Sequence, residues 1–277
     1  MSWSVEVESS LRQIWDSAQP GSWASFDFDN TIVSGDISEG LLGYQITHGL
    51  IPEANLASFP PLTVDGSQVS ASEDPAAYYG AIMRSGSSVG VDYANYPGAV
   101  WLAQVLAGLS LEDVLNSLVN ICGETTTTFL PTTPTTNAGF VTPVLRDPVV
   151  ELIGNLITHG VRVRVISAGL VWAVRWYVCS VLNPQLAVGF GPDVQIELSD
   201  VMGIGVALLD SRTGTITSDR YLLSDAEYLA CSANRTSELR LTPLIDGPLT
   251  FAEGKIAGAT ERYGTRPPHL VVGDSPG

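Results

Sequence analysis

Two aspartates at the end of a short apolar segment constrain the fold of this chain more than any other feature. Residues 23–28 read Trp-Ala-Ser-Phe-Asp-Phe, and Asp29-Asn30-Thr31 follows directly. Large apolar groups with few polar ones are typical of a buried β-strand. Because Asp27 and Asp29 are two residues apart, their side chains share one face for as long as the strand continues. The sequence therefore predicts a strand that presents two carboxylates at its carboxyl end.

Alternating helices and strands in the second half of the chain indicate a sheet of the α/β class. The apolar run Val161–Ile166 follows a predicted helix directly. The expected elements are a helix over 147–159, this strand, a helix over 170–182, a hairpin over 206–223, a helix over 251–263 and a strand over 269–272. Helix, strand and helix in series are typical of a parallel sheet. The predicted fold is α/β, a Rossmann-like parallel sheet with an inserted, mainly helical subdomain.

The insert lies between the first strand and the rest of the sheet. Asp74 before Pro75, and Ser110 before an acidic turn, are typical of the first residues of helices. Helices are therefore expected over 37–48, from 74, after 97 and over 110–122.

Two segments of the insert lack a regular pattern. Residues 51–73 are rich in Pro and Ser and are predicted to be irregular, and the Thr/Pro tract over 124–142 is predicted to be a linker. The expected boundaries are 1–39 and 146–277 for the sheet domain and 40–145 for the insert.

Polar side chains stand where the predicted strands end. Asp27 and Asp29 close the first strand, and Ser167 follows the next one. Asp274 follows the last strand, and Lys255 lies in the helix before it. Because ligands of open α/β sheets bind at the carboxyl ends of the strands, we expect these side chains to converge.

Such a set of side chains suits the transfer of a phosphoryl group. The carboxylates of Asp27, Asp29 and Asp274 offer the hard oxygen ligands that Mg²⁺ prefers. Asp27 can attack phosphorus, and Asp29 can give a proton to the leaving oxygen and take one from water. Ser167 and Lys255 can hold the phosphoryl oxygens. The sequence thus predicts an enzyme, a phosphoric monoester hydrolase with Mg²⁺ as cofactor and a small phosphorylated metabolite as substrate.

The segment from Asp27 to Thr31 resembles the DxDxT first motif of the haloacid-dehalogenase-like (HAD) hydrolases. Ser167 resembles the second motif, Lys255 the third, and Asp274 in Gly-Asp-Ser the fourth, all in the family's order. Within the superfamily, the chain is similar to the phosphorylcholine phosphatase branch, beside the phosphoserine phosphatases. That closer resemblance rests on residues 29–31, 36, 39, 41–42, 96–97, 101–111, 165–168 and 212–214.

The resemblance implies a Mg²⁺-dependent phosphomonoesterase with a helical cap inserted after the first motif. Its implied metal ligands are Asp27, Asp29 through its backbone carbonyl, and Asp274. Its implied phosphate ligands are Thr31, Ser167, Ala168 and Lys255. The sequence ends at Gly277, before the second acid that the resemblance leads us to expect after Gly-Asp-Ser.

Other interpretations of these residues stay open at this point. Ser167 and Asp274 are common in turns and helix caps, and a helical lysine such as Lys255 is usually only solvated. The alternative functions are a non-catalytic or vestigial phosphate-binding module and a phosphoserine-type phosphatase.

Residues of the insert bear on the substrate. Glu39, Tyr96 and Trp101 are candidate substrate contacts, with a helix-surface carboxylate and aromatic packing as the alternatives. Aromatic faces hold quaternary ammonium groups by cation–π attraction. Arg84 is the only Arg or Lys between Asp36 and Leu145, so the insert offers little to bind a substrate carboxylate. Phosphorylcholine-like compounds are therefore expected first and phosphoserine-like compounds second.

Charge and composition exclude several classes of partner. The 13 Lys and Arg residues against 29 Asp and Glu residues give a net charge of −16. Such a charge disfavours nucleic acid and anionic membrane surfaces. Three scattered cysteines and three unpaired histidines predict neither a disulfide framework nor a zinc site. Nothing in the sequence indicates an oligomeric state.

The first residues of the chain bear on its location. They show neither a basic segment nor an apolar run, so no signal peptide is predicted. A cytoplasmic location is expected, with a mature secreted form as the alternative.

Overall fold

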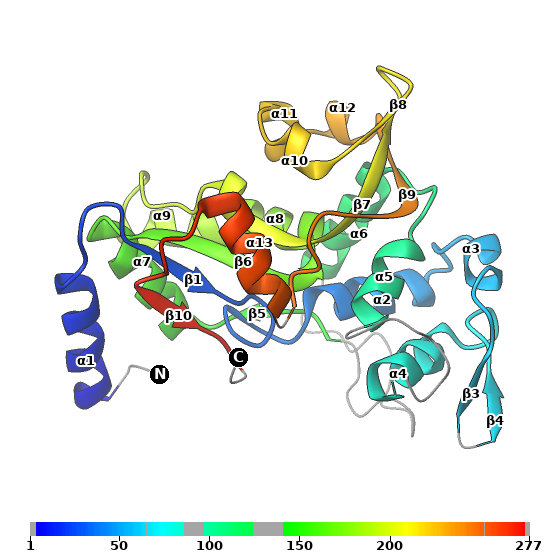
Figure 1. The fold of residues 1–277 in the computed structure, drawn as a ribbon, viewed down its shortest axis with the longest axis horizontal. Helices are drawn as coiled ribbons and strands as arrows, with labels where there is room; N and C mark the ends of the chain where they lie inside the picture. The colour runs from blue at the N-terminus through cyan, green and yellow to red at the C-terminus, as the bar shows by residue number, and fades with distance from the viewer. Residues whose placement is uncertain (1–3, 65, 86–96, 124–140, 252, 275–277) are drawn as a thin grey trace. The chain divides into compact units, whose positions relative to one another are not determined.

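The computed structural model describes residues 4–64, 66–85, 97–123, 141–251 and 253–274 (Figure 1). The chain divides into two compact units. The core unit contains Met1–Ser34, Pro143–Gly203 and Pro248–Gly277. The insert unit contains Gly35–Thr142 and Ile204–Gly247. No helix in the described part of the chain is long and apolar enough to cross a membrane.

Three parallel strands form the centre of the core unit, which confirms the predicted α/β class. Strand β1 (Trp23–Phe26) lies between β10 (Leu270–Val272) and β6 (Arg162–Leu170). Phe26 pairs with Val165 on one side and with Val272 on the other. The three strands therefore end at the same edge of the sheet. Strand β7 (Val201–Asp210) follows β6 in the order and continues into the insert unit.

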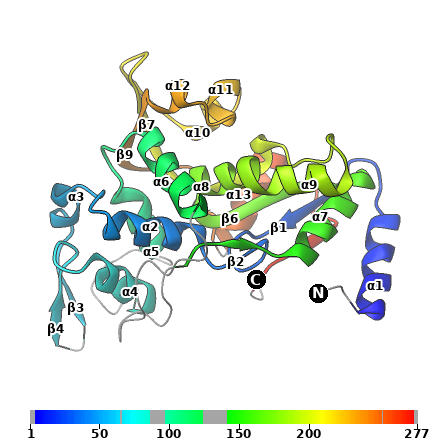
Figure 2. The same ribbon diagram turned by 180° about the vertical axis from the view of Figure 1, so that it is seen from behind.

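Helices cover both faces of this sheet. Helices α7 (Asp147–Thr158), α8 (Val171–Tyr177) and α9 (Asn183–Phe190) lie on one face, and α13 (Glu253–Tyr263) lies on the other (Figures 1 and 2). The helix predicted over 170–182 is real, but its last turn, Val178–Leu182, is π-helical and leads into α9. Helix α1 (Val5–Asp16) packs on α7, and the short β2 (Val33–Ser34) pairs with β5 (Val144–Leu145).

A partly buried arginine, Arg164, connects α13 to the sheet. The guanidinium of Arg164 lies 3.9 Å from the ring centre of Tyr263 and 4.6 Å from that of Trp23. Asp200, which is 1% exposed, supplies the counter-charge 3.5 Å from Arg164. Sliding of the helix would separate the Arg164 guanidinium from the Tyr263 ring and lose this cation–π contact, whereas Asp200 would keep its second partner, Arg162. Helix α13 carries Lys255, so this clamp helps to position that side chain.

Helices dominate the first part of the insert unit, as predicted. They are α2 (Ile37–Thr47), α3 (Glu53–Ala57), α4 (Pro75–Ser85), α5 (Pro97–Gln104) and α6 (Leu111–Gly123). The prediction of an irregular segment over 51–73 is wrong in part. It contains α3 and a hairpin of β3 (Leu62–Val64) and β4 (Ser67–Val69), whose turn uses Gly66 at φ +81°. Most of the predicted Thr/Pro linker lies outside the described residues.

The second part of the insert unit contains elements that we did not predict. The expected hairpin is present as β7 with β8 (Thr215–Thr217). The unpredicted elements are α10 (Asp219–Leu222), α11 (Ala226–Leu229), α12 (Ala233–Thr236) and β9 (Leu239–Asp246).

The domain boundaries differ from the expected ones over residues 204–247. We assigned this segment to the sheet domain, but it groups with the insert. Backbone hydrogen bonds explain why: Gly108 N–H donates to Leu241 O at 2.8 Å, and Leu241 N–H donates to Leu109 O at 2.9 Å.

Candidate active site

A sharp turn after β1 positions the two aspartates. Asp27 N–H donates to Val272 O at 2.9 Å, so Asp27 still continues the pairing of β1 with β10. Three consecutive N–H groups, those of residues 31–33, then donate to Phe28 O. The turn places Asn30 at φ +55°, a left-handed conformation that asparagine tolerates better than most residues. Asp27 and Asp29 therefore stand at the carboxyl edge of the sheet, as predicted.

Lys255 and Asp27 form an ion pair across 228 positions of sequence. Lys255 Nζ donates to Asp27 Oδ2 at 2.5 Å, and the other carboxylate oxygen accepts a hydrogen bond from Phe28 N–H at 2.8 Å. Both side chains are partly exposed, at 28% for Lys255 and 19% for Asp27. Lys255 is the only lysine of the chain. The fold thus brings the sole ammonium side chain onto the first carboxylate of the motif.

Ser167 contacts the second carboxylate. Its Oγ donates to Asp29 Oδ2 at 3.2 Å and accepts a hydrogen bond from Gly169 N–H at 2.8 Å. Ser167 is fully buried. Sequence reasoning missed Thr250, whose hydroxyl donates to Ser167 O at 2.5 Å from the segment before α13. Thr250 is also fully buried, and no local pattern marked it because its partner is 83 positions away.

The remaining predicted ligands are Thr31, Ala168 and Asp274, which lie on segments of the core unit next to these residues. Thr31 is 5% exposed, and its hydroxyl has no hydrogen-bond partner within the described ranges. Ala168 follows Ser167 on β6. Asp274 is exposed and lies two residues beyond Val272, the residue that pairs with Phe26. Their roles as phosphate and metal ligands stay predictions.

The donor chemistry at this edge suits Mg²⁺. Within the described part of the chain, no three side chains of His, Cys, Asp or Glu gather closely enough to hold a metal ion. The expected set needs only two side chains, Asp27 and Asp274, with a backbone carbonyl as the third ligand. Mg²⁺ commonly binds through one or two carboxylates and keeps several waters. The acids at the ends of neighbouring strands β1 and β10 fit such a site by donor type.

Within the insert unit, Glu39 lies in α2 and accepts a hydrogen bond from Tyr79 OH at 3.1 Å. Burial, together with the charge of Asp36, raises the pKa of Glu39 to about 7, although the hydrogen bond from Tyr79 opposes this shift. Trp101 is 1% exposed and packs on Tyr78 at 5.5 Å between ring centres. This placement agrees with the packing alternative for Trp101, whereas Tyr96 lies outside the described residues.

We expect a Glu39→Gln substitution to flatten the pH dependence of stability. Between the ordinary carboxyl pKa of 4.5 and about 7, the folded state binds more protons at Glu39 than the unfolded state does. The free energy of unfolding therefore decreases as pH rises through this window. Glutamine carries no charge, so at pH 8 the variant should be more stable than the wild type by about 1–3 kcal/mol.

Urea unfolding at pH 5 and pH 8 measures this effect. Glu53→Gln, at an exposed position in α3, is the matched control and should behave like the wild type at both pH values. An unchanged difference between the two pH values in Glu39→Gln would show that Glu39 is already charged at neutral pH.

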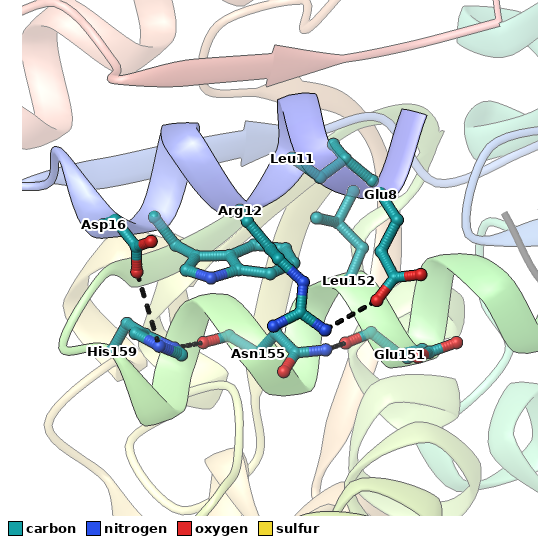
Figure 3. Close-up of a pocket in the computed structure, with 9 residues that line it drawn as sticks. Glu8, Leu11, Arg12, Asp16, Glu151, Leu152, Asn155 and His159 are labelled. Carbon is teal, nitrogen blue, oxygen red and sulfur yellow. Dashed lines mark hydrogen bonds and ion pairs between the residues drawn. The ribbon is translucent and has the colours of Figure 1, made fainter. Parts of the chain in front are cut away.

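A separate pocket of about 180 Å³ lies between α1 and α7 (Figure 3). Arg12 pairs with Glu8 there, and His159 lies 4.0 Å from Asp16 and against the ring of Trp15. These contacts dock α1 on α7. The pocket contains none of the predicted site residues.

Comparisons with known proteins show which proteins this chain resembles. No family model matches it. The chain is 26% identical over 267 residues to the phosphorylcholine phosphatase of Pseudomonas aeruginosa, and the match covers 94% of this chain and 70% of that protein. This match confirms the predicted resemblance to the phosphorylcholine phosphatase branch. Because that relative is a phosphatase, the comparison also agrees with the prediction that this chain is an enzyme.

Solved structures support the fold. A conserved protein of unknown function from Anaerococcus prevotii has a TM-score of 0.55 and 14% identity to this chain, and the match covers 99% of this chain and 80% of that one. A substrate-bound phosphoserine phosphatase has a TM-score of 0.38 and 12% identity, covering 90% of this chain and 75% of that one. The structure from Anaerococcus prevotii supports the fold of this chain.

Proposed function

We propose that this chain hydrolyses phosphate monoesters of small organic molecules, phosphorylcholine-like compounds first. The observation that carries the proposal is the placement of Lys255 on Asp27 and of Ser167 on Asp29 at one sheet edge. Four motifs that are far apart in sequence supply these groups and Asp274. The homology to a phosphatase supports the same reaction class.

In the proposed reaction, an Asp27 carboxylate oxygen attacks phosphorus and the bond to the ester oxygen breaks. Asp29 gives its proton to the departing alcohol oxygen, which leaves an aspartyl-phosphate on Asp27. Asp29 then takes a proton from water, and the resulting oxygen attacks phosphorus to release phosphate and free Asp27. The hydrogen bond from Phe28 N–H to Asp27 Oδ1 fixes the carboxylate during the attack.

Two further groups would bind the phosphoryl oxygens in this proposal. The Lys255 ammonium can move from Asp27 to the incoming phosphoryl group, because that group brings more negative charge to the same place. The hydroxyl of Thr31, which has no hydrogen-bond partner among the described residues, is a second donor of suitable chemistry. Ser167 reaches the phosphoryl group only if its hydroxyl leaves Asp29, so its role includes holding Asp29 in position.

We further propose that the reaction requires Mg²⁺, held by Asp27, Asp274 and the backbone carbonyl of Asp29. When bound, the metal would neutralise charge on the carboxylates and on the phosphoryl group. Removal of divalent metal with a chelator should then abolish hydrolysis, and added Mg²⁺ should restore it. Titration of activity against Mg²⁺ measures this, with Ca²⁺ as a comparison ion. Full activity after exhaustive chelation would refute the requirement.

Substrate preference gives a direct comparison between two candidates. Between Asp36 and Leu145, the sequence contains one Arg or Lys residue, Arg84. The same segment contains Glu39, whose pKa is raised to about 7. A cationic head group suits this composition better than a carboxylate does. We therefore expect kcat/KM for phosphorylcholine to exceed that for phosphoserine by about tenfold or more, which corresponds to about 1.4 kcal/mol. Faster turnover of phosphoserine would reverse the assignment.

Hydrolysis of p-nitrophenyl phosphate with and without Mg²⁺ tests the reaction class. The proposal predicts Mg²⁺-dependent release of nitrophenol by the wild type. Binding of phosphate without any turnover, in a sample that unfolds cooperatively, would favour the vestigial phosphate-binding module instead.

A further inference from the structure

The segment that leads into α13 is bonded to the central strand β6. Thr250 is fully buried, and its hydroxyl donates to Ser167 O at 2.5 Å. Residues 248–251 belong to the core unit, as β6 does. The two partners are 83 positions apart in sequence, so this bond is a tertiary contact and not part of a local turn. It therefore fixes the start of α13 on the strand that carries Ser167.

Thr250 connects the two pairs of side chains in the proposed site. On one side, Ser167 accepts from Thr250 through its carbonyl and donates to Asp29 Oδ2 through its hydroxyl at 3.2 Å. On the other side, the chain continues from Thr250 into the first turn of α13, where Lys255 Nζ donates to Asp27 Oδ2 at 2.5 Å. One hydroxyl thus joins the residue that holds Asp29 to the segment that carries Lys255.

Close packing of this segment transmits a shift of Thr250 to Lys255. Phe251 N–H donates to Leu249 O at 2.9 Å, and Gly254 N–H donates to Phe251 O at 2.8 Å. A Cβ atom at Gly254 would lie 1.7 Å from Leu249 O, so the segment folds directly against the residue before Lys255. Because close-packed groups transmit strain, a displacement of residues 248–251 moves the first turn of α13 as well.

We propose that Thr250 is a positioning residue for phosphoryl transfer, an inference that rests on the proposed function. Its hydroxyl holds Ser167 and the start of α13 in one arrangement, so that Lys255 meets Asp27. Thr250 acts through Ser167 and Lys255, and it takes no part in the bond-making steps. Phosphoryl transfer depends mainly on positioning and electrostatic stabilisation, and a misplacement of about 1 Å can cost about 100-fold in rate.

Thr250→Val tests the hydroxyl, because valine keeps the branched shape of threonine and removes the donor. The buried Ser167 carbonyl loses this hydrogen bond, and the first turn of α13 is released. We expect kcat/KM for p-nitrophenyl phosphate to fall by about 10- to 100-fold. Thr250→Ser keeps a hydroxyl and should restore kcat/KM to within about threefold of the wild type. Thr250→Ala removes the same donor and takes the place of Thr250→Val if the valine variant does not unfold cooperatively.

Thr236→Val is the matched control. Thr236 is 1% exposed, and its hydroxyl also donates to a backbone carbonyl, that of Ser232, at 3.0 Å. It lies in α12 of the insert unit, outside the proposed catalytic group. Both valine variants should lower the thermal midpoint to a similar extent, but Thr236→Val should keep the wild-type kcat/KM. This comparison separates positioning from stability.

Lys255 allows a measurement that needs no turnover, because it is the only lysine of the chain. Acetylation with acetic anhydride, followed by mass spectrometry of the peptide that contains Lys255, reports how well the contact with Asp27 shields its amine. Thr250→Val should raise the rate of acetylation by about 1.5- to 5-fold, the range that a partly exposed ion pair allows. Thr236→Val should be acetylated at the wild-type rate.

The two measurements separate this inference from the proposed function. A wild type that hydrolyses no phosphate ester would refute the proposed function, and the acetylation rates would still show whether Thr250 positions Lys255. Wild-type acetylation together with wild-type kcat/KM in Thr250→Val would overturn the positioning role. A Thr250→Ser variant as slow as Thr250→Val would also overturn it, because the hydroxyl would then have no effect.

Discussion

Asp27→Asn is expected to lose phosphatase activity by about 10⁴-fold or more, the scale seen when a nucleophile is removed from an enzyme. Asparagine has the same shape, and its oxygen can still accept the hydrogen bond from Phe28 N–H. Its amide cannot attack phosphorus and form the covalent intermediate. It also carries no charge for Lys255, which is 2.5 Å from the wild-type carboxylate. Steady-state kcat/KM with phosphorylcholine measures the loss.

The thermal midpoint separates lost chemistry from lost folding in this variant. The Asp27–Lys255 pair is partly exposed, so its contribution to stability is small and Asp27→Asn should melt close to the wild type. Asp16→Asn, at a position with a 68% exposed side chain on α1, is the matched control and should keep full activity. Retention of more than a tenth of the wild-type rate by Asp27→Asn would mean that another group attacks the substrate.

Arg235→Met is expected to destabilise the protein by about 3–5 kcal/mol, because it leaves the buried carboxylate of Asp210 without its cation. The Arg235 side chain is 4% exposed. Its Nη2 lies 2.7 Å from Asp210 Oδ2, and its Nε lies 2.7 Å from Asp225 Oδ2. A third acid, Glu238, lies 3.4 Å away. Urea unfolding at pH 7 measures the loss.

The pH dependence of this effect follows from Asp210. The hydrogen bond from Arg235 holds the pKa of Asp210 below its ordinary value of 3.8. A carboxyl group with a lowered pKa in the folded state stabilises the protein above its unfolded-state pKa, and that stability is lost as pH falls. The difference between wild type and Arg235→Met should therefore shrink below about pH 4.

Arg12→Ala supplies the comparison for Arg235. Arg12 pairs with Glu8 along α1, but its side chain is 64% exposed, so this substitution should change stability by no more than about 0.5 kcal/mol. Equal effects of the two substitutions would show that the Arg235 cluster contributes no more than a surface ion pair does.

The site residues that could be predicted from the sequence are those whose positions follow from the geometry of a parallel sheet. Asp27 and Asp274 come after strands β1 and β10, which end at one edge of the sheet. Ser167 was expected after a strand that ends at Ile166, but β6 continues to Leu170, so Ser167 lies within the strand, two residues beyond the Val165 that pairs with Phe26. Lys255 could be placed because it is the only lysine and precedes the last strand. The sequence pattern did not predict that Lys255 pairs with Asp27. This ion pair depends on how α13 packs on the sheet, and that packing involves Arg164, Trp23 and Tyr263.

The parts that sequence reasoning missed depend on contacts between distant residues. Helices α11 and α12 have four residues each, which is too short to show a helical period in the sequence. Arg235, with partners 10 and 25 positions away, holds this region together. Strand β9 is bonded to Leu109 and to Gly108, and no local signal indicates such a pairing. The same reason explains the wrong boundary over 204–247.

Rapid quenching of the enzyme with radiolabelled substrate shows whether the phosphoryl group is transferred to Asp27. Acid quenching within one turnover, followed by proteolysis and peptide mapping, locates any covalent phosphate. We expect the label on the peptide that contains Asp27, and we expect hydroxylamine to release it, as it releases an acyl phosphate. The Asp27→Asn variant should carry no label. Turnover with label on a different residue, or turnover by Asp27→Asn at the wild-type rate, would contradict it.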